Sequence, residues 1–259
     1  MVDIELRGVN KSFASGAGEI HVLQDIDLSI PMGEVVAIRG DNGSGKTTLL
    51  NIIAGIEVPS QGTIEFHGLQ GGRPRVGYIQ QDYTSSLLPW FNVIDNVSLP
   101  LRLRGMARSA RNNRAEESLN ALGSKFKRLP RAKFPHQLSG GQRQGVAIAR
   151  ALVHEPHLLL LDEPFANLDA HTSRDLQNAL SHIHITQRPS ILYVSHVLDH
   201  CIYLADRILL LYGHPARIAG DFRVQLPHPR ERNMMRCDAF QEVRTQILSE
   251  EESLYAKGE

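Results

Sequence analysis

A glycine-rich segment constrains the fold of this 259-residue chain more than any other feature. The segment "GDNGSGKT" (40–47) follows the apolar run "EVVAIR" (34–39) and precedes "TTLLNIIAG" (47–55), which has the length of a short helix. The apolar run predicts a buried strand, and Gly55 is a typical helix end. Strand, glycine turn and helix in this order form the framework in which backbone N–H groups surround an anion. We therefore expect an anion-binding loop at the N-terminus of a helix.

The segment fits the pattern G-x-x-x-x-G-K-[ST], in which each residue type has a role toward a triphosphate. Glycines let the backbone turn its N–H groups inward, and the following helix adds the positive end of its dipole. Lys46 supplies a mobile positive charge for the β- and γ-phosphates, and the hydroxyl of Thr47 can bind Mg²⁺. The predicted phosphate-binding residues are Gly40, Asn42, Gly43, Ser44, Gly45, Lys46, Thr47 and Thr48.

Composition and charge narrow the class of protein. Lys plus Arg equals Asp plus Glu at 28 each, so no overall charge attracts the chain to nucleic acid. The two cysteines, Cys201 and Cys237, suit a reducing compartment rather than a disulfide framework. The start "MVDIELRG" lacks the build of a secretory signal, and apolar runs such as 208–212 are far shorter than the roughly 20 residues that span a bilayer. We expect a soluble intracellular protein, in which any membrane role must come through a partner.

Strand-like runs alternate with helix-length segments along much of the chain. They recur at "LLLLD" (158–162), "ILYVS" (191–195) and "RILLLY" (207–212), which predicts an α/β fold with a mostly parallel sheet covered on both faces. From about 85 to 140 the strand runs stop and the sequence becomes helical and basic. The predicted parts are a core with an N-terminal β subdomain at 1–84 and 141–220, an inserted helical subdomain at 85–140, and a C-terminal extension at 221–259.

The C-terminal extension predicts one amphipathic helix in "MMRCDAFQEVRTQIL" (234–248) and a frayed end in "EEESLYAKGE" (250–259). His182 and His184 lack the partners of a metal site, so we interpret them as surface residues.

The run "LLLLDEP" (158–164) places two acids where a buried strand ends. Ligands of open α/β sheets bind at this edge, so Asp162 suits the outer coordination of Mg²⁺. Glu163 points elsewhere and can polarise a water for attack on the γ-phosphate. The alternative is a strand that merely ends in two acids, and the loop at 40–47 favours the magnesium interpretation.

A second glycine step, "LSGGQ" (138–142), also leads into a helix. With it, six motifs stand in the order "GDNGSGKT", a glutamine in "GYIQQD", "LSGGQ", "LLLLDEP", "NLD" and "SH". In this order the chain resembles, over nearly its whole length, the ATP-binding subunit of an ABC transporter. The resemblance implies a P-loop NTPase (RecA-like) core with an N-terminal antiparallel β subdomain and an inserted α-helical signalling subdomain.

The resemblance also implies a head-to-tail dimer that traps two ATP molecules with Mg²⁺. Each ATP lies on the loop of one subunit and is covered by "LSGGQ" of the other, so one chain carries two half-sites. The implied partners are a second ATP-binding subunit in a homodimer, integral membrane permease subunits and an extracytoplasmic solute-binding protein, without nucleic acid. The implied location is the cytoplasmic face of the inner (plasma) membrane. The residues that would cover the facing ATP are Ser139, Gly140, Gly141 and Gln142.

Individual roles follow by matching motifs. Gln81 matches the glutamine that touches Mg²⁺ or the attacking water and senses the membrane partner, although Gln80 is adjacent and the register stays open. His196 matches the switch histidine that contacts the γ-phosphate. The implied catalytic residues are Lys46, Gln81, Glu163 and His196, and the implied metal-binding residues are Thr47, Gln81 and Asp162.

Two further positions contact the nucleotide by the same resemblance. Asp169 in "ANLD" matches the loop that couples the two sites, where Asn167 stands at a position that is often serine in the family. Phe13 in "NKSF" matches the aromatic residue that stacks on adenine, with core packing as the alternative.

Local stretches favour a subfamily. "SSLLPWFNVIDNVSLPL" (85–101) and "YLADRILLLYGHPARIAGDFRVQLPHPRER" (203–232) resemble importer ATPases for nitrate, sulfonate and taurine, which suggests a small anionic solute of that kind or bicarbonate. "GEIHVLQDIDLSIPMGE" (18–34) resembles ATPases of efflux and lipoprotein-release systems, so export is the alternative. A non-transport ABC ATPase acting on nucleic acid is a more distant alternative, supported only by the basic stretch 102–133.

Overall fold

A computed structural model of the chain describes residues 3–16, 18–68, 73–82, 86–166 and 168–257. The chain forms two compact units, the first made of Met1–Pro74 with Ser190–Glu259 and the second of Arg75–Pro189. In the part of the chain that is described, no helix has both the length and the apolar character needed to cross a bilayer.

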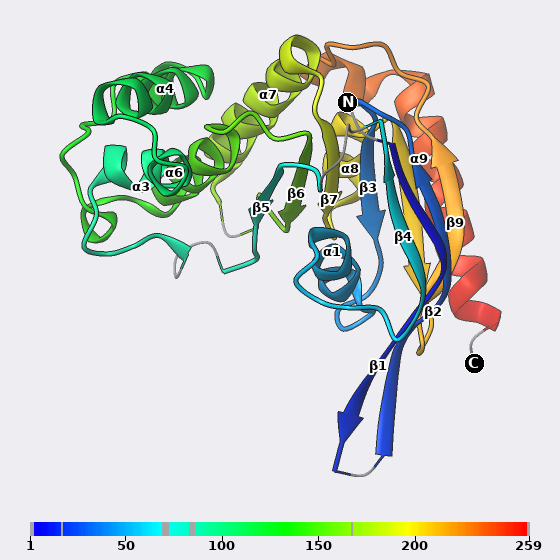
Figure 1. Cartoon of the computed structure of the whole chain (residues 1–259). Helices are drawn as coiled ribbons and strands as arrows, with labels where there is room; N and C mark the ends of the chain where they lie inside the picture. The colour runs from blue at the N-terminus through cyan, green and yellow to red at the C-terminus, as the bar shows by residue number, and fades with distance from the viewer. Residues whose placement is uncertain (1–2, 17, 69–72, 83–85, 167, 258–259) are drawn as a thin grey trace. The chain divides into compact units, whose positions relative to one another are not determined.

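The first unit contains two groups of strands. A three-stranded antiparallel sheet has the order β2-β1-β4, and in the second group β3 lies parallel to both β7 and β8 while β9 runs antiparallel to β8 (Figure 1). Strands β3 and β7 are nearly continuous apolar runs, as is typical of parallel strands that are buried on both faces. The elements are β1 (Asp3–Ser15), β2 (Gly18–Ile30), β3 (Val35–Arg39), α1 (Lys46–Ala54), β4 (Gln61–His67), β7 (Ser190–Val194), α8 (Leu198–Leu204), β8 (Arg207–Tyr212), β9 (Arg217–Arg223), η2 (Arg232–Arg236) and α9 (Asp238–Lys257).

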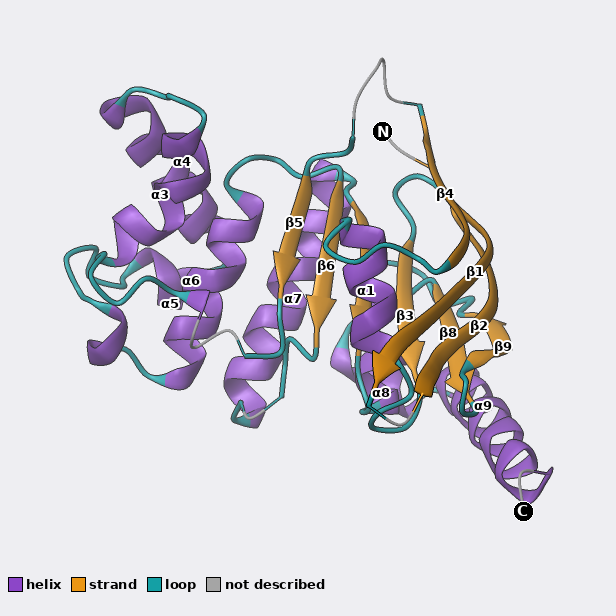
Figure 2. Ribbon diagram, turned by 60° about the horizontal axis from the view of Figure 1, so that its bottom comes forward, coloured by secondary structure: helices purple, strands orange, loops and turns teal. Residues whose placement is uncertain are grey.

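The second unit joins two parallel strands to a group of helices (Figure 2). Its elements are β5 (Val76–Ile79), α3 (Val93–Leu103), α4 (Arg108–Ala121), α5 (Ser124–Lys127), η1 (Pro135–Gln137), α6 (Gly140–Leu152), β6 (Leu158–Asp162) and α7 (Ala170–Gln187). Phe126 is fully buried against α6, where a Cβ on Gly145 would lie 1.9 Å from the Phe126 ring. Glycine is therefore required where α5 approaches α6.

The elements agree with most of the local predictions. The strands predicted at 158–162 and 207–212 have these bounds, and the helix predicted after the glycine loop spans Lys46–Ala54 and ends at Gly55 with φ of 75°. The fold class is confirmed as α/β with an antiparallel N-terminal sheet.

Two predictions are wrong. The chain does not fray from residue 250 onward, because α9 continues to Lys257 and the side chains of Glu251 and Tyr255 are bonded to other parts of the unit. His184 is not a surface residue, since it is 7% exposed and its Nδ1 lies 3.4 Å from the carbonyl oxygen of Pro189. Both differences come from contacts between segments that local sequence does not reveal.

Candidate functional site

The phosphate loop of the first unit, residues 40–47, connects β3 to α1. Gly45 occupies the N-cap position of α1 with φ of 84°, and no side chain caps the first turn of this helix. The side chains of Ser44 and Lys46 are 2% and 8% exposed, whereas Asp41, Asn42 and Gly43 face solvent. The exposed residues 41–43 thus lie beside the buried Lys46, and the N-terminus of α1 follows directly.

Two glycines in this loop are required by close contacts. A Cβ on Gly40 would lie 2.2 Å from the carbonyl oxygen of Leu211 in β8, and a Cβ on Gly45 would lie 2.8 Å from Cγ1 of Val22 in β2. The left-handed φ of Gly45 adds a second reason, since side-chain-bearing residues rarely adopt it. The glycine pattern of the sequence therefore reflects backbone geometry at both positions.

Lys46 is held inside the loop. Its Nζ donates to the carbonyl oxygen of Gly40 at 2.9 Å and to that of Asp41. The ammonium therefore lies among carbonyl oxygens inside the loop, at a position where it could also bind a phosphate oxygen. Thr47 and Thr48 follow in the first turn of α1, exposed and half-buried respectively.

Two other predicted residues lie in the first unit. His196 follows β7 and is exposed, and its backbone carbonyl accepts a hydrogen bond from the guanidinium of Arg39 at the end of β3. Phe13 lies on β1 and is 36% exposed, with the Lys11 ammonium 4.6 Å from its ring centroid. Because its ring is at the surface, packing in the core does not account for Phe13.

In the second unit, Asp162 ends β6 and Glu163 begins a constrained turn. Asp162 and Glu163 are 2% and 8% exposed, and Glu163 has a left-handed φ of 49°. A non-glycine residue in this conformation is strained, and such strain is concentrated at functional sites. The fully buried Gln144 of α6 holds the turn, because its Nε2 donates to the carbonyl oxygen of Pro164 at 2.7 Å.

The charge of Asp162 acts on a neighbouring strand. Burial, with the negative charge of Asp162, raises the pKa of Tyr78 in β5 above its ordinary value. Gln80 and Gln81 follow this strand and are both exposed, so the choice between them stays a prediction.

The "LSGGQ" segment forms the N-terminus of α6. Ser139 is the N-cap: its Oγ accepts from the backbone N–H of Gln142 at 3.3 Å, and the Gln142 Oε1 accepts from the N–H of Ser139 at 3.0 Å. This reciprocal pair is a capping box. Ser139 itself is exposed, so the helix orients its hydroxyl at a surface that solvent reaches.

Thr172 links α6 to α7. A Cβ on Gly141 would lie 2.4 Å from Thr172 Cγ2, and Thr172 Oγ1 accepts a hydrogen bond from Lys125 Nζ at 2.7 Å. Asp169 caps α7 by accepting from the N–H groups of Thr172 at 2.9 Å and His171 at 3.1 Å. These hydrogen bonds, those from Thr172 first, lower the pKa of the Asp169 carboxyl. Gly141 and Asp169 thus both contact Thr172.

The predicted residues divide between the two units, and Asn167 lies outside the described residues. The first unit holds Phe13, residues 40–48 and His196, and the second holds Gln81, residues 139–142, Asp162, Glu163 and Asp169. Sequence reasoning missed Arg39, Lys125, Gln144 and Thr172, because their roles come from contacts between distant segments that carry no local pattern.

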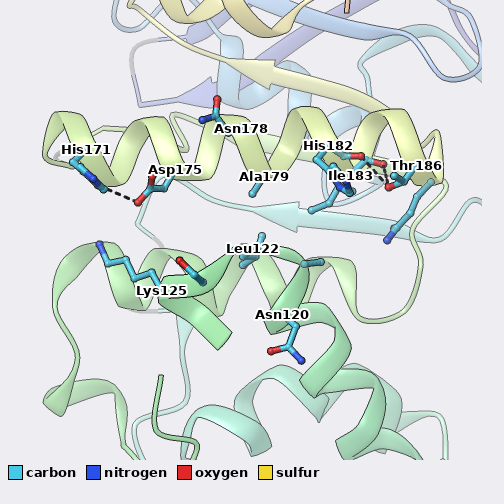
Figure 3. Close-up of a pocket in the computed structure, with 14 residues that line it drawn as sticks. Asn120, Leu122, Lys125, His171, Asp175, Asn178, Ala179, His182, Ile183 and Thr186 are labelled. Atoms are coloured by element: carbon cyan, nitrogen blue, oxygen red, sulfur yellow. Dashed lines mark hydrogen bonds and ion pairs between the residues drawn. The ribbon is translucent and has the colours of Figure 1, made fainter. Parts of the chain in front are cut away.

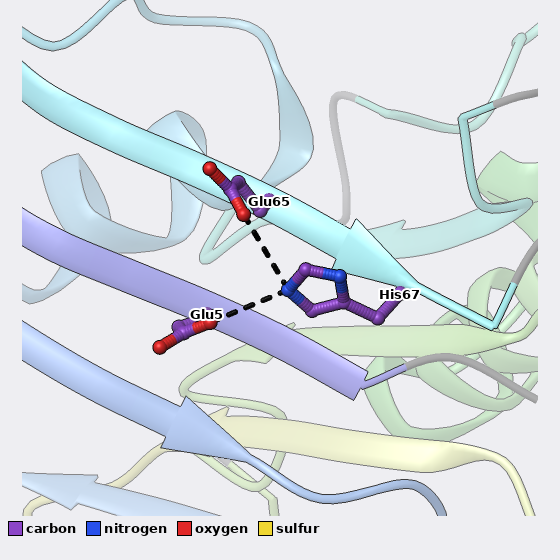
Figure 4. A group of neighbouring side chains, drawn as sticks. All are labelled: Glu5, Glu65 and His67. Atoms are coloured by element: carbon purple, nitrogen blue, oxygen red, sulfur yellow. Dashed lines mark hydrogen bonds and ion pairs between the residues drawn. The ribbon is translucent and has the colours of Figure 1, made fainter.

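Two other features lie apart from these residues. A groove of about 1020 Å³ lies between the turn after α4 and one face of α7, lined by polar residues such as Lys125, Asp175 and His182 (Figure 3). On the N-terminal sheet, His67 Nε2 lies 3.3 Å from Glu5 and 3.5 Å from Glu65 (Figure 4). Both oxygens of Glu5 also accept from Arg7 at 2.9 Å, so this group is an ion-pair network on the surface.

Known proteins match the chain along most of its length. The profile of the family described as "ABC transporter" matches residues 23–166. An aliphatic sulfonates import ATP-binding protein of Bacillus licheniformis is 36% identical over 97% of this chain and 95% of its own length. A nitrate transport protein of Klebsiella oxytoca is 36% identical over 95% of this chain and 94% of its own length.

Solved structures agree with these sequences. A dimeric ATP-binding cassette in a post-hydrolysis state, bound to ADP and Pi, superposes with a TM-score of 0.75 at 29% identity, covering 86% of this chain and all of that one. A phosphate loop, an acid pair after a buried strand and this cassette fold define an ATPase of the P-loop class, as the sequence predicted. The chain belongs to the ABC transporter family, as an ATP-binding subunit that couples ATP hydrolysis to transport.

Proposed function

We propose that this ATPase drives import of a small anionic solute, such as nitrate, a sulfonate, taurine or bicarbonate, as a head-to-tail homodimer. The observation that carries the dimer is the exposed N-terminus of α6. Ser139 Oγ accepts from Gln142 and is exposed, so its O–H would be able to donate to an oxygen of a facing chain's nucleotide. The similarity to sulfonate and nitrate transport proteins supports the solute class.

The residues of each half-site have complementary roles in this proposal. Lys46 and the N–H groups of α1 bind the phosphates, and His196 contacts the γ-phosphate. Glu163 would accept a proton from the attacking water, and the hydrogen bond from Gln144 to the next residue restrains the strained backbone that carries it.

The donor set suits Mg²⁺. Thr47, Gln81 and Asp162 offer a hydroxyl, an amide and a carboxylate oxygen, which are hard ligands of the kind that this ion prefers. When bound, Mg²⁺ would neutralise phosphate charge. Asp162 is 2% exposed at the carboxyl end of β6, and a bound cation would offset the cost of burying its carboxylate charge.

The remaining partners follow from the importer assignment. We propose that residues 85–140 form the signalling subdomain of a chain in which 1–84 and 141–220 form the core and 221–259 an extension. The surface near Gln81 and residues 85–100 would receive helices of integral membrane permease subunits on the cytoplasmic face of the membrane. An extracytoplasmic binding protein would deliver the solute.

Nucleotide-dependent dimerisation tests the proposal directly. Glu163→Gln should stop hydrolysis, so this variant should remain dimeric with Mg·ATP and monomeric without it, as measured by analytical ultracentrifugation. Adding Ser139→Arg should leave the protein monomeric while it still binds a fluorescent ATP analogue, because the loop is intact and only the facing contact is lost.

Ser124→Arg is the matched control, since Ser124 is an exposed serine at the start of another helix of the same unit. It should dimerise like its parent. Equal dimerisation of the Ser139→Arg variant would show that α6 does not face a second nucleotide. In the same background Lys46→Ala should lose nucleotide binding, and unchanged affinity would disprove the role of the loop.

The solute is tested by uptake. Deleting the chain in its native cell should reduce uptake of at least one of labelled taurine, nitrate or bicarbonate, and Glu163→Gln should not restore it. Normal uptake of all of them, with loss of an export activity, would favour the efflux alternative.

A further inference from the structure

The C-terminal helix α9 packs against the rest of the first unit through one stripe of residues on the helix. Phe240 and Ile247 are 1% and 0% exposed, and Arg244, Glu251 and Tyr255 continue the same spacing of three or four residues. Residues at this spacing share one face of a helix. α9 runs beside β9, and the contacts of its stripe lead from α8 to the phosphate loop (Figure 1).

The middle of the stripe reaches the segment that carries His196. Glu251 forms an ion pair with Arg39, with Oε2 3.1 Å from Nη2, and the two side chains are only 16% and 18% exposed. The other end of the same guanidinium donates to the backbone carbonyl of His196. Arg244 pairs with Asp199 in α8, three residues further on, at 3.1 Å. Arg39 is therefore a bridge between α9 and the backbone of the histidine.

The end of the stripe reaches the phosphate loop itself. The Tyr255 hydroxyl donates to the Asp41 carboxylate at 2.5 Å, and the Tyr255 ring packs edge-on against Tyr212 with centroids 5.3 Å apart. The hydrogen bond to Asp41 is the main reason that the pKa of Tyr255 is raised to about 12. The backbone carbonyl of Asp41 also accepts from Lys46, so Tyr255 is two contacts away from the ammonium that binds phosphate.

We propose that α9 is a positioning element of the nucleotide half-site, with Glu251 setting His196 through Arg39 and Tyr255 setting the phosphate loop through Asp41. The inference rests on the roles proposed above for His196 and the loop. Because the two contacts end on different parts of the half-site, they have different consequences. Glu251 acts on hydrolysis and Tyr255 acts on nucleotide binding.

The test uses the full chain and steady-state ATP turnover, with titration of a fluorescent ATP analogue. Glu251→Ala should lower kcat about tenfold with little change in KM, on the scale of one lost charge-assisted hydrogen bond. Glu251→Gln keeps an acceptor for Arg39 and should recover part of kcat. Tyr255→Phe keeps the ring on Tyr212 but loses the hydroxyl, so it should weaken nucleotide binding about threefold and leave kcat near normal.

Glu252→Ala is the matched control, because Glu252 is exposed on the same helix. It should behave like the parent, and thermal unfolding of all variants shows whether each is folded. If Glu251→Ala and Tyr255→Phe match the control in kcat and KM, α9 does not position the half-site. Lys46→Ala distinguishes failure of this inference from failure of the proposed site. If Lys46→Ala loses nucleotide binding while the α9 variants are normal, only the role of α9 is disproved. If Lys46→Ala binds nucleotide normally, the proposed site itself is disproved.

Discussion

At the N-terminus of α1, Gly45 stands in the N-cap position and supplies no side chain, whereas at the N-terminus of α6 the Ser139 side chain caps the first turn. Glycines stand at the start of both helices, Gly45 just before α1 and Gly140 and Gly141 in the first turn of α6, so the two sequences look alike. Gly45 offers no side-chain acceptor to the first turn of α1, whereas Ser139 accepts from an N–H of α6 and presents a hydroxyl at the surface. In the proposed dimer, these two glycine-rich helix starts would contact one nucleotide from opposite sides by different chemistry.

The glycines themselves differ in the same way. Gly45 is required by its left-handed backbone and by contact with Val22, while Gly141 lies inside α6 and is required only by contact with Thr172. A steric contact can be relieved by replacing the neighbouring side chain with a smaller one, but this replacement does not remove the need for a left-handed backbone.

The largest effect is expected for Gly45→Ala. A non-glycine residue in a disfavoured backbone region costs about 1–3 kcal/mol, and about 1.4 kcal/mol corresponds to a factor of ten in affinity. ATP-analogue binding should fall about tenfold or more by that measure. Val22→Ala removes the contact at 2.8 Å but leaves φ at 84° and the contact with Leu23 Cδ2 at 2.9 Å, so the double variant should stay defective. Full recovery would mean that contact alone selects this glycine.

Gly141→Ala should be the converse case. Overpacking costs about 1–3 kcal/mol, so ATP turnover should fall about tenfold while analogue binding to the loop is unchanged. Thr172→Ser removes the methyl group that lies 2.4 Å from the new Cβ and keeps the hydroxyl for Lys125. The double variant should regain turnover, and failure to do so would contradict the steric explanation.

A smaller effect is expected when the cap is removed. Ser139→Ala should lower stability by about 1 kcal/mol, which shifts the melting temperature by about 2–4 °C in a chain of this size. Ser139→Asp is the informative companion because a carboxylate caps equally well. It should restore the melting temperature but not ATP turnover, since its charge repels phosphate. Restored turnover would show that Ser139 acts only as a cap.

The smallest effect concerns pH and Asp169. Its folded-state pKa is lowered, chiefly by the hydrogen bonds from Thr172, so the carboxylate contributes stability above its ordinary pKa of 3.8 that is lost as pH falls through the lower folded value. The stability difference between the wild type and Asp169→Asn should therefore shrink on going from about pH 6 to about pH 3, measured by urea unfolding. A difference independent of pH would mean that the carboxylate charge is not used at this cap.

Local patterns predicted the strands, α1 and the loop because these depend on neighbours in sequence. The glycine motif required a strand before it and a helix after it, and β3 and α1 are in those places. The continuation of α9 to Lys257 and the burial of His184 were missed because both depend on contacts that form only in the folded chain.

Site residues follow the same division. Gly45 and Ser139 could be found from their own motifs, while Thr172 and Gln144 act through side chains that meet their partners only after folding. The left-handed backbone of Glu163 also had no signal in the sequence, since a residue before proline favours extended conformations.

Lys46 has one more consequence. By donating to the carbonyl oxygens of Gly40 and Asp41, it keeps the loop curled using the chain's own atoms. The conformational entropy of the loop is therefore mostly lost during folding and not on binding. A triphosphate would only have to reposition the ammonium of Lys46. Association should be fast and little affected by temperature, as expected for a loop that is ordered before its ligand arrives.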